Sequence, residues 1–242
     1  MQVPSEPADE CQPAALAAVA GQLFADGPLK LRLLQRYRPY LCPFHKLLPL
    51  VPPSATVLDA GCGGGLFLGL LASTRGLARG LGFDSSPEAI EVARRMSLRL
   101  PATVAAHSTQ HTAHSTRSQL TFEHRRVEDR WPDEEFDVVS LIDVMHHVAP
   151  TEQRTLIHLA AERVRPGGLL LYKDMCQRPL WRATANRAHD LLLARQWIHY
   201  VPIASVITWA RDEGLTAERQ EVLNQLWYGH ELVVFRREVG KD

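Results

Sequence analysis

Four glycines within five residues, directly after a short apolar run, constrain this chain more than any other feature. Val57 and Leu58 predict the end of a buried strand, residues 61–65 a tight turn, and residues 66–68 the start of a helix. Glycine permits the positive φ angles that such a turn needs, and its missing Cβ lets a ligand lie against the backbone N–H groups that open the next helix. The stretch therefore predicts a site for a nucleotide-type cofactor.

The residues around the glycines narrow the kind of cofactor. A dinucleotide fingerprint requires Gly-x-Gly-x-x-Gly, and here Gly61 and Gly63 fit whereas Leu66 stands at the third position. Asp59 lies two residues before the first glycine. A carboxylate there would repel a pyrophosphate but suits a cofactor that carries a free ammonium group. A purely structural strand-to-helix turn is the alternative.

The run Val-Leu-Asp-x-Gly-Cys-Gly-x-Gly at 57–65 resembles the first motif of the class I S-adenosylmethionine-dependent methyltransferases. The resemblance implies that the glycines pass under the amino-acid end of the cofactor and that the acidic residue holds it, directly or through water. The expected cofactor-binding positions in this turn are Asp59, Gly61, Cys62 and Gly63. The Cys62 side chain itself is expected to pack, since a small apolar residue suffices there.

Asp84 ends the next predicted strand, at 81–84, and precedes a helix start in which Ser86 is the N-cap and Pro87 the first helical residue. Because Ser86 already supplies the cap, we expect Asp84 to accept hydrogen bonds from both ribose hydroxyls, with Ser85 beside it. Asp84 lies 23 residues beyond Gly61, close to the roughly 20-residue spacing of ribose-binding acids in βαβ units. A plain turn aspartate is the alternative.

A third strand, expected at 120–125, leads to Glu128 and Asp129. In the resembled family this strand end supplies an acid to the adenine amino group. Arg126 occupies one register in which that acid is expected, so the assignment between Glu128 and Asp129 stays open, with a solvated loop acid as the alternative.

The fourth strand is predicted as a near-continuous apolar run at 136–143 that ends in Asp143. In the family this strand end lies beneath the methionine portion of the cofactor, so Asp143 is an expected cofactor contact. His146 and His147 follow, and either imidazole could take a proton from an acceptor hydroxyl or could serve only in structural hydrogen bonding. A metal site is the least favoured reading, because no further ligand is identifiable.

Composition bounds the class of protein. The 242 residues are 45% hydrophobic, and 27 cations balance 27 acids, so the overall charge does not indicate a nucleic acid or an anionic membrane as partner, although local patches are not excluded. The four cysteines are scattered, which favours reduced thiols in the cytoplasm, and no apolar run is long enough to span a membrane.

The expected fold is α/β: a doubly wound, mostly parallel seven-stranded sheet whose last strand is antiparallel. Thr151 is expected to cap a helix that runs to Val164 and stops at a turn over 165–168, before a fifth strand at 169–172. The last two strands are expected at 215–223 and 231–237, joined by a linker at 224–230.

Residues 1–53 are expected to form an N-terminal helical cap, with helices at 13–24 and 28–38, and residues 54–242 the cofactor-binding domain. On the second of these helices, Leu31, Leu34 and Tyr37 are expected on one apolar face, and the cations are expected on a solvated face: Lys30, Arg32, Arg36 and Arg38. Within the domain, 101–119 is predicted to be a loop insertion, whose His107, His111 and His114 are expected to be solvated, and 174–202 a segment that recognises the acceptor.

The resemblance implies a methyltransferase that moves the methyl group of S-adenosylmethionine by in-line displacement and leaves S-adenosylhomocysteine. The neutral overall charge and the aromatic and apolar flanking segments favour a small or lipid-like acceptor. Methylation on oxygen, carbon or nitrogen stays open, as does the oligomeric state. Two other classes stay open: a non-catalytic S-adenosylmethionine-binding protein and, less favoured, a nicotinamide-dependent oxidoreductase.

Overall fold

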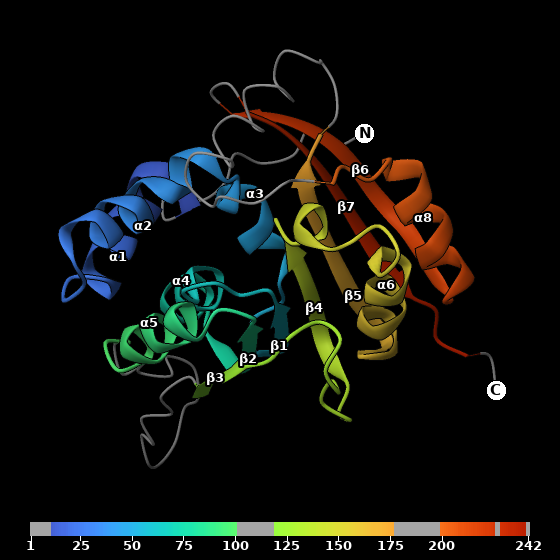
Figure 1. Cartoon of the computed structure of the whole chain (residues 1–242), viewed down its shortest axis with the longest axis horizontal. Coiled ribbons are helices and arrows are strands. Elements are labelled where there is room, and N and C mark those ends of the chain that lie inside the picture. Colours follow the sequence, from blue (N-terminus) through green and yellow to red (C-terminus); the bar gives the residue numbers. More distant parts are fainter. Residues whose placement is uncertain (1–10, 101–118, 177–198, 226–227, 241–242) are drawn as a thin grey trace, which may run out of the picture.

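The computed structural model describes residues 11–100, 119–176, 199–225 and 228–240, which build a seven-stranded sheet with helices on both faces (Figure 1). The strands are β1 (Ala55–Ala60), β2 (Leu77–Asp84), β3 (Gln119–His124), β4 (Phe136–Ile142), β5 (Val164–Met175), β6 (Leu215–Gln225) and β7 (Tyr228–Arg237). Their order is β3-β2-β1-β4-β5-β7-β6, and β7 runs antiparallel to both neighbours. This confirms the doubly wound sheet with an antiparallel last strand.

The sheet separates two hydrophobic cores. Successive strand residues point to opposite faces, so Val57 and Val138 join one core whereas Leu58 and Val139 join the other. One face is covered by α1 (Pro13–Leu23), α3 (Phe44–Leu47), α4 (Leu66–Thr74) and α5 (Pro87–Ser97), and the other by α6 (Gln153–Glu162) and α8 (Ile203–Asp212) (Figure 1). Burial on both faces explains why the central strands are almost continuously apolar.

Local sequence signals fix the helices that follow β1 and β2. The glycine turn leads directly into α4, which begins at Leu66, as predicted from the sequence. At α5 the Ser86 hydroxyl accepts a hydrogen bond of 3.1 Å from the Ala89 N–H, and Pro87 is the first helical residue, as predicted. These two helix starts place the ends of β1 and β2 beside each other.

The N-terminal segment departs from expectation. The second helix, α2 (Leu29–Leu41), does not end at Arg38, and Pro39 lies inside it. Pro39 removes one helical hydrogen bond, the one to the Gln35 carbonyl, near the end of the helix. The buried face of α2 carries Gln35 and Pro39. Leu34 and Tyr37 are exposed, although they were expected on one apolar face. A short 3-10 turn, η2 (Leu48–Leu50), completes the connector to β1.

Three boundaries also differ. Thr151 does not cap a helix, because α6 begins at Gln153 after Glu152 and has no side-chain cap. The predicted Arg165–Gly168 turn lies inside the bounds of β5, as an irregularity at which the pairing with β4 jumps from Val164 to Leu169 and Gly167 has a φ of +77°. The hairpin linker is shorter than expected, because Gln225 pairs with Tyr228 and extends both strands. In the hairpin, ladder pairing outweighs the local turn signal.

Two predicted segments lie largely outside the described residues. The first is the insertion at 101–119, of which only Gln119 is described, so His107, His111 and His114 lie outside the described residues. The second is the expected acceptor segment at 174–202, most of which also lies outside them. Of the helices in the described ranges, none is both long and apolar enough to cross a bilayer.

Candidate functional site

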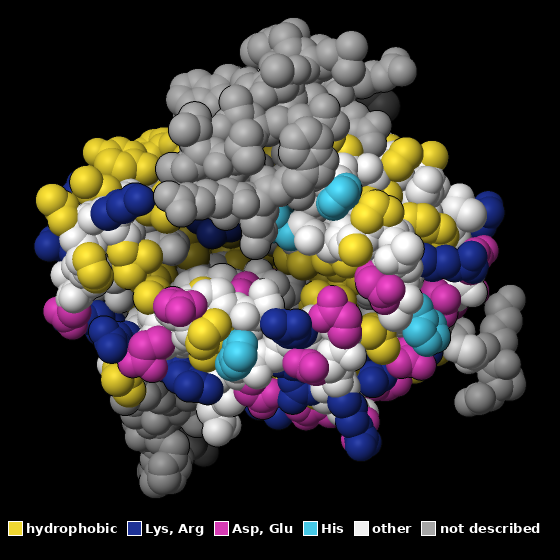
Figure 2. Space-filling model, in the orientation of Figure 1, with side chains coloured by type: hydrophobic (Ala, Val, Ile, Leu, Met, Phe, Trp, Pro, Cys, Tyr) yellow, Lys and Arg dark blue, Asp and Glu magenta, His cyan; other side chains and the backbone are white. Residues whose placement is uncertain are grey.

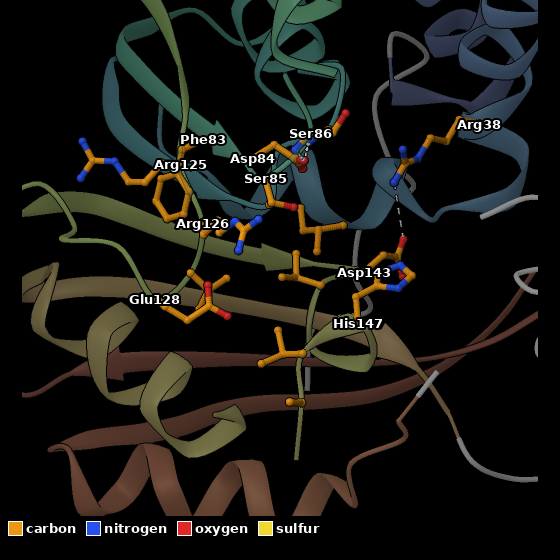
Figure 3. A pocket seen from close by; sticks show the side chains of 17 residues that line it. Arg38, Phe83, Asp84, Ser85, Ser86, Arg125, Arg126, Glu128, Asp143 and His147 are labelled. Atoms are coloured by element: carbon orange, nitrogen blue, oxygen red, sulfur yellow. Dashed lines mark hydrogen bonds and ion pairs between the residues drawn. The ribbon is translucent and has the colours of Figure 1, made fainter. Parts of the chain in front are cut away.

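A cavity of about 650 Å³ opens at the carboxyl edge of the sheet, over the ends of β1, β2 and β4 (Figure 3). In an open α/β sheet this edge, at the point where the strand order reverses, is where ligands bind. Its volume is within the range of small-molecule sites, roughly 300–1,000 Å³. Seven residues predicted from the sequence line it: Gly61, Gly63, Asp84, Ser85, Glu128, Asp143 and His147.

Two glycines of the turn have separate roles. Gly63 has a φ of +54°, and a Cβ there would meet nothing closer than Arg38 Nη1 at 4.0 Å. Its backbone is therefore bare toward the cavity. Gly61 has a φ of +75°, and a Cβ there would come within 2.4 Å of Val144 Cγ2, so this glycine is required for packing against the loop that follows β4.

Asp84 occupies the end of β2, where its carboxylate is held by backbone N–H groups. Oδ2 accepts a 2.8 Å hydrogen bond from the Gly63 N–H, and Oδ1 accepts one of 2.9 Å from the Ser86 N–H. Asp84 thus ties the glycine turn to the start of α5. The hydrogen bond from Ser86 is the turn role given above as the alternative, whereas the sequence did not indicate the one from Gly63. Each carboxylate oxygen retains acceptor capacity for a ligand hydroxyl.

The loop after β3 closes one end of the cavity. Glu128 and Arg126 line it, whereas Asp129 does not. The Asp129 carboxylate accepts a 2.7 Å hydrogen bond from the Arg126 N–H and shapes the turn that presents Glu128. Behind this wall the buried Trp131 ring meets Phe83 edge-on, with centroids 4.8 Å apart. Of the two acids that the sequence left open, the geometry favours Glu128 as the one that faces a ligand.

Asp143 occupies the opposite end, directly after β4, with a φ of +57°. Its N–H donates to the Lys173 carbonyl at 2.8 Å, and its carboxylate accepts a 2.5 Å hydrogen bond from the fully buried Lys173 Nζ. Arg38 Nη2 lies 4.0 Å from the other carboxylate oxygen (Figure 3). Burial alone would raise the pKa of Asp143, but Lys173, His230 and Arg38 outweigh it and hold this pKa well below its usual range.

The structure separates the two histidines. His146 is 2% exposed, does not line the cavity, and pairs through Nδ1 with the buried Asp174 carboxylate, which also accepts the His146 backbone N–H. His147 lines the cavity mouth, with its ring centroid 4.0 Å from that of His146. Partial desolvation, followed by the neighbouring His146, lowers the pKa of His147 to about 4, so its imidazole is neutral at pH 7.

Gln153 fixes the turn that carries both histidines, η3 (Met145–His147). Its buried amide nitrogen lies 3.2 Å from the Val148 carbonyl and 3.3 Å from that of His199, and it donates toward both. The His199 N–H donates in turn to the His146 carbonyl at 2.8 Å. Asp174 carries no sequence signal for its role, because it lies 28 residues beyond His146 and meets it only through strand pairing. Gln153 lies five residues beyond Val148, but no sequence pattern shows that its amide is buried.

Asp59 and Cys62 lie behind the cavity wall and do not line it. Asp59 is 3% exposed and accepts a 2.6 Å hydrogen bond from the Ser140 hydroxyl. Burial, which outweighs this hydrogen bond, raises the pKa of Asp59 to about 7. Cys62 is buried and packs its sulfur toward Gly82, in agreement with the packing role expected for its side chain.

Arg38 is the main site residue that the sequence did not indicate. It comes from α2, whose cations were expected on a solvated face, yet its guanidinium reaches the cavity between Gly63 and Asp143 (Figure 3). The only available signal was its position one turn beyond Gln35, on the side that packs inward. Within the described ranges, no cluster of three or more His, Cys, Asp or Glu residues is arranged to hold a metal ion.

Comparisons with known proteins agree on the family. A family model described as a methyltransferase domain matches residues 33–220. The chain is 28% identical over 243 residues to the ubiquinone biosynthesis O-methyltransferase of Xanthomonas axonopodis pv. citri, with 93% of this chain and 88% of that protein covered. It is 30% identical over 164 residues to the ribosomal protein L11 methyltransferase of Burkholderia mallei, with 68% and 42% covered.

A solved structure supports the fold. The magnesium protoporphyrin IX methyltransferase of Synechocystis PCC 6803 with bound SAH has a TM-score of 0.63 at 17% identity, with 91% of this chain and 93% of that one covered. The family match spans well over half of the 242 residues. The chain therefore belongs to the methyltransferase domain family, the class I enzymes with a Rossmann-like fold that use S-adenosylmethionine.

Proposed function

We propose that this enzyme methylates a hydroxyl group of a small or lipid-like molecule. The observation that carries the proposal is a single cavity with carboxylates at one end and a neutral histidine beside Asp143 at the other. The relative that is an O-methyltransferase of ubiquinone biosynthesis supports an oxygen acceptor, because the match covers 88% of that protein. The match to the ribosomal protein methyltransferase covers less than half of it and gives weaker support to a protein acceptor.

The residues of the cavity fit S-adenosylmethionine group by group. Asp84 offers carboxylate acceptors to the ribose hydroxyls, and Glu128 offers one to the adenine amino group. The bare backbone at Gly63 leaves room for the amino-acid end of the cofactor, where Arg38 supplies a cation for its carboxylate. Asp59, behind the turn, and Asp143 supply negative charge for its ammonium group.

When bound, the cofactor supplies a methyl group that is already activated by the positive sulfur. The protein therefore has to orient the acceptor and exclude water rather than to provide covalent machinery. His147 is the side chain placed to act on the acceptor, since one of its ring nitrogens can accept the hydroxyl proton. His146, held by Asp174, supports the turn from which His147 projects and is a positioning residue.

Cofactor binding is tested by titration calorimetry with S-adenosylmethionine, S-adenosylhomocysteine and NAD, on the wild type and on Asp84→Ala. We expect S-adenosylmethionine and S-adenosylhomocysteine to bind the wild type, and we expect Asp84→Ala to lower the affinity for both. Binding of NAD alone would contradict the cofactor assignment and favour a nicotinamide oxidoreductase. Glu88→Ala is a matched control, because this exposed carboxylate lies next to the same loop but does not line the cavity.

The acceptor class is tested by screening catechols, phenols, quinols and ribosomal proteins for methyl transfer from radiolabelled cofactor. We expect labelling of a hydroxylated small molecule, and a fall in kcat of roughly a hundredfold in His147→Ala with cofactor affinity unchanged. His158→Ala, on the surface of α6, is the control histidine. Labelling of protein only would overturn the acceptor proposal, and no transfer to any class would favour a non-catalytic binding protein.

A further inference from the structure

The outer side of α2 exposes an unusual group of apolar side chains. Within the described chain, eight large hydrophobic side chains are strongly exposed, and five of them belong to this one helix. We define the α2 outer face by these five residues: Leu29, Leu33, Leu34, Tyr37 and Tyr40. Isolated exposed apolar residues are ordinary, but a cluster on one element marks an interaction surface.

The helical spacing places most of these side chains in one stripe. Leu29, Leu33 and Tyr37 are four residues apart, Tyr40 follows three later, and the two tyrosine rings have centroids 6.3 Å apart. Figure 2 shows hydrophobic side chains gathered over the α1 and α2 end of the molecule, with Lys and Arg side chains beside them. The opposite side of the helix packs inward through Gln35 and Pro39. The stripe thus faces solvent while the helix itself is anchored.

The charge around the stripe is of one sign. Lys30, Arg32 and Arg36 are exposed on the same helix, and the sequence has no acidic residue between Asp26 and Asp59. Asp26 itself pairs with Arg99 of the segment after α5. An overall charge of zero therefore conceals a local cationic, apolar surface. A second copy of the same face would be repelled by it, whereas an anionic surface is attracted.

We propose that the α2 outer face docks the enzyme on an anionic lipid bilayer. The leucines and tyrosines enter the boundary between headgroups and acyl chains, and the flanking cations contact lipid phosphates. The inner side of the same helix carries Arg38 into the cavity, and a Cβ at Gly64 would lie 3.3 Å from the Gln35 amide nitrogen. The docked helix would therefore lie directly over the cofactor turn. The proposal is independent of the acceptor, because vesicle binding needs none.

The test is co-sedimentation of the full chain with vesicles of phosphatidylcholine, with and without phosphatidylglycerol. We expect binding only when phosphatidylglycerol is present, and we expect high salt to weaken it. Leu33→Gln combined with Tyr37→Gln should bind at least about tenfold more weakly. Each of Arg32→Gln and Arg36→Gln should weaken binding about fivefold.

Matched controls lie outside α2. Val239→Gln removes an exposed apolar side chain that follows β7 and lies beside Gly167, and Arg211→Gln removes an exposed cation from α8, so both should bind vesicles as the wild type does. All variants change exposed side chains, and circular dichroism checks that each is folded.

Three results would overturn the proposal. The first is no binding to anionic vesicles, and the second is binding that the α2 variants leave unchanged. The third is a concentration-dependent dimer in sedimentation velocity that Leu33→Gln with Tyr37→Gln abolishes, without vesicle binding, since a second copy would then cover the face.

Discussion

The two ends of the cavity are built on different electrostatic principles. At the end formed by β2 and β3, Asp84 is held by neutral N–H groups and Glu128 faces the cavity, so their negative charge is available to a ligand. At the β4 end, Asp143 is already paired with the buried Lys173 and lies near Arg38. The first end therefore offers open carboxylates to ligand donors. At the second end most of the charge of Asp143 is compensated by a buried scaffold that also holds Arg38 near the cavity, so less negative charge is left for a ligand.

The largest expected effect is a loss of stability on removing Lys173, the buried cation of the scaffold at the β4 end. Lys173→Met leaves the carboxylate of Asp143 without its main partner, and we expect a loss of about 3–5 kcal/mol of unfolding free energy. Urea unfolding followed by circular dichroism measures it. Arg95→Met, which breaks an exposed pair with Glu91 on α5, should cost at most about 1 kcal/mol. Equal losses in the two variants would show that the β4 end is not a buried scaffold.

Acid should weaken the β4 end specifically. Burial, reinforced by Lys173, lowers the pKa of His230 to about 3, below its unfolded value of about 6.5. This imidazole then binds fewer protons in the folded state, so its own contribution to stability is constant above about pH 6.5 and falls by up to roughly 1.4 kcal/mol per pH unit as the pH decreases from there. The difference in unfolding free energy between the wild type and His230→Gln, measured from pH 7 to pH 4.5, should show this slope, because His147 and Asp59 titrate in both proteins. A difference that does not change with pH would assign the acid sensitivity elsewhere.

Ligand fragments distinguish the two ends. Asp84→Asn should weaken binding of adenosine and S-adenosylhomocysteine alike, by about tenfold or more, because it removes a charged acceptor. Arg38→Met should weaken only S-adenosylhomocysteine, by a similar factor, because adenosine carries no carboxylate. Calorimetric titration of both ligands into both variants measures this. Loss of adenosine binding in Arg38→Met would mean that the ends do not act separately.

The smallest expected effect is a fraction of one proton. Since the pKa of Asp59 is about 7, this carboxyl is partly protonated at neutral pH, and an approaching ammonium group should ionise it. Cofactor binding at pH 7 should then release up to about half a proton. Calorimetry in buffers of different ionisation enthalpy detects this as a buffer-dependent binding enthalpy. Asp59→Asn should abolish the dependence, and its persistence would point to another titrating group.

The two ends also differ in how far the sequence predicts them. Ser86, Pro87 and the glycines act on neighbours within a few residues, so α4, α5 and the position of Asp84 were predicted correctly. The β4 end joins Arg38, Asp143 and Lys173, which are far apart in the chain. No local pattern records such pairings.

The errors have the same cause. Arg38 was assigned to a solvated face because cations on a helix usually are, and only the packing of α2 on the sheet edge brings it to the cavity. His146 and His147 are adjacent in sequence, yet tertiary contacts bury one with Asp174 and leave the other at the cavity mouth. The sequence therefore predicted the fold and the position of Asp84, and it named both histidines as candidates without showing that only His147 lines the cavity.

Gly61, in the loop after β1, packs closely against Val144, in the loop after β4, since a Cβ at position 61 would collide with the Val144 side chain. The loop after β1 therefore sets the height of the loop that carries His147, and the two positions are not free to diverge independently. Across related genes we expect a substitution at 61 to be accompanied by a smaller residue at 144. Introducing Gly61→Ala into a Val144→Ala background should damage the enzyme less than introducing it alone, although the positive φ at 61 will keep part of the cost.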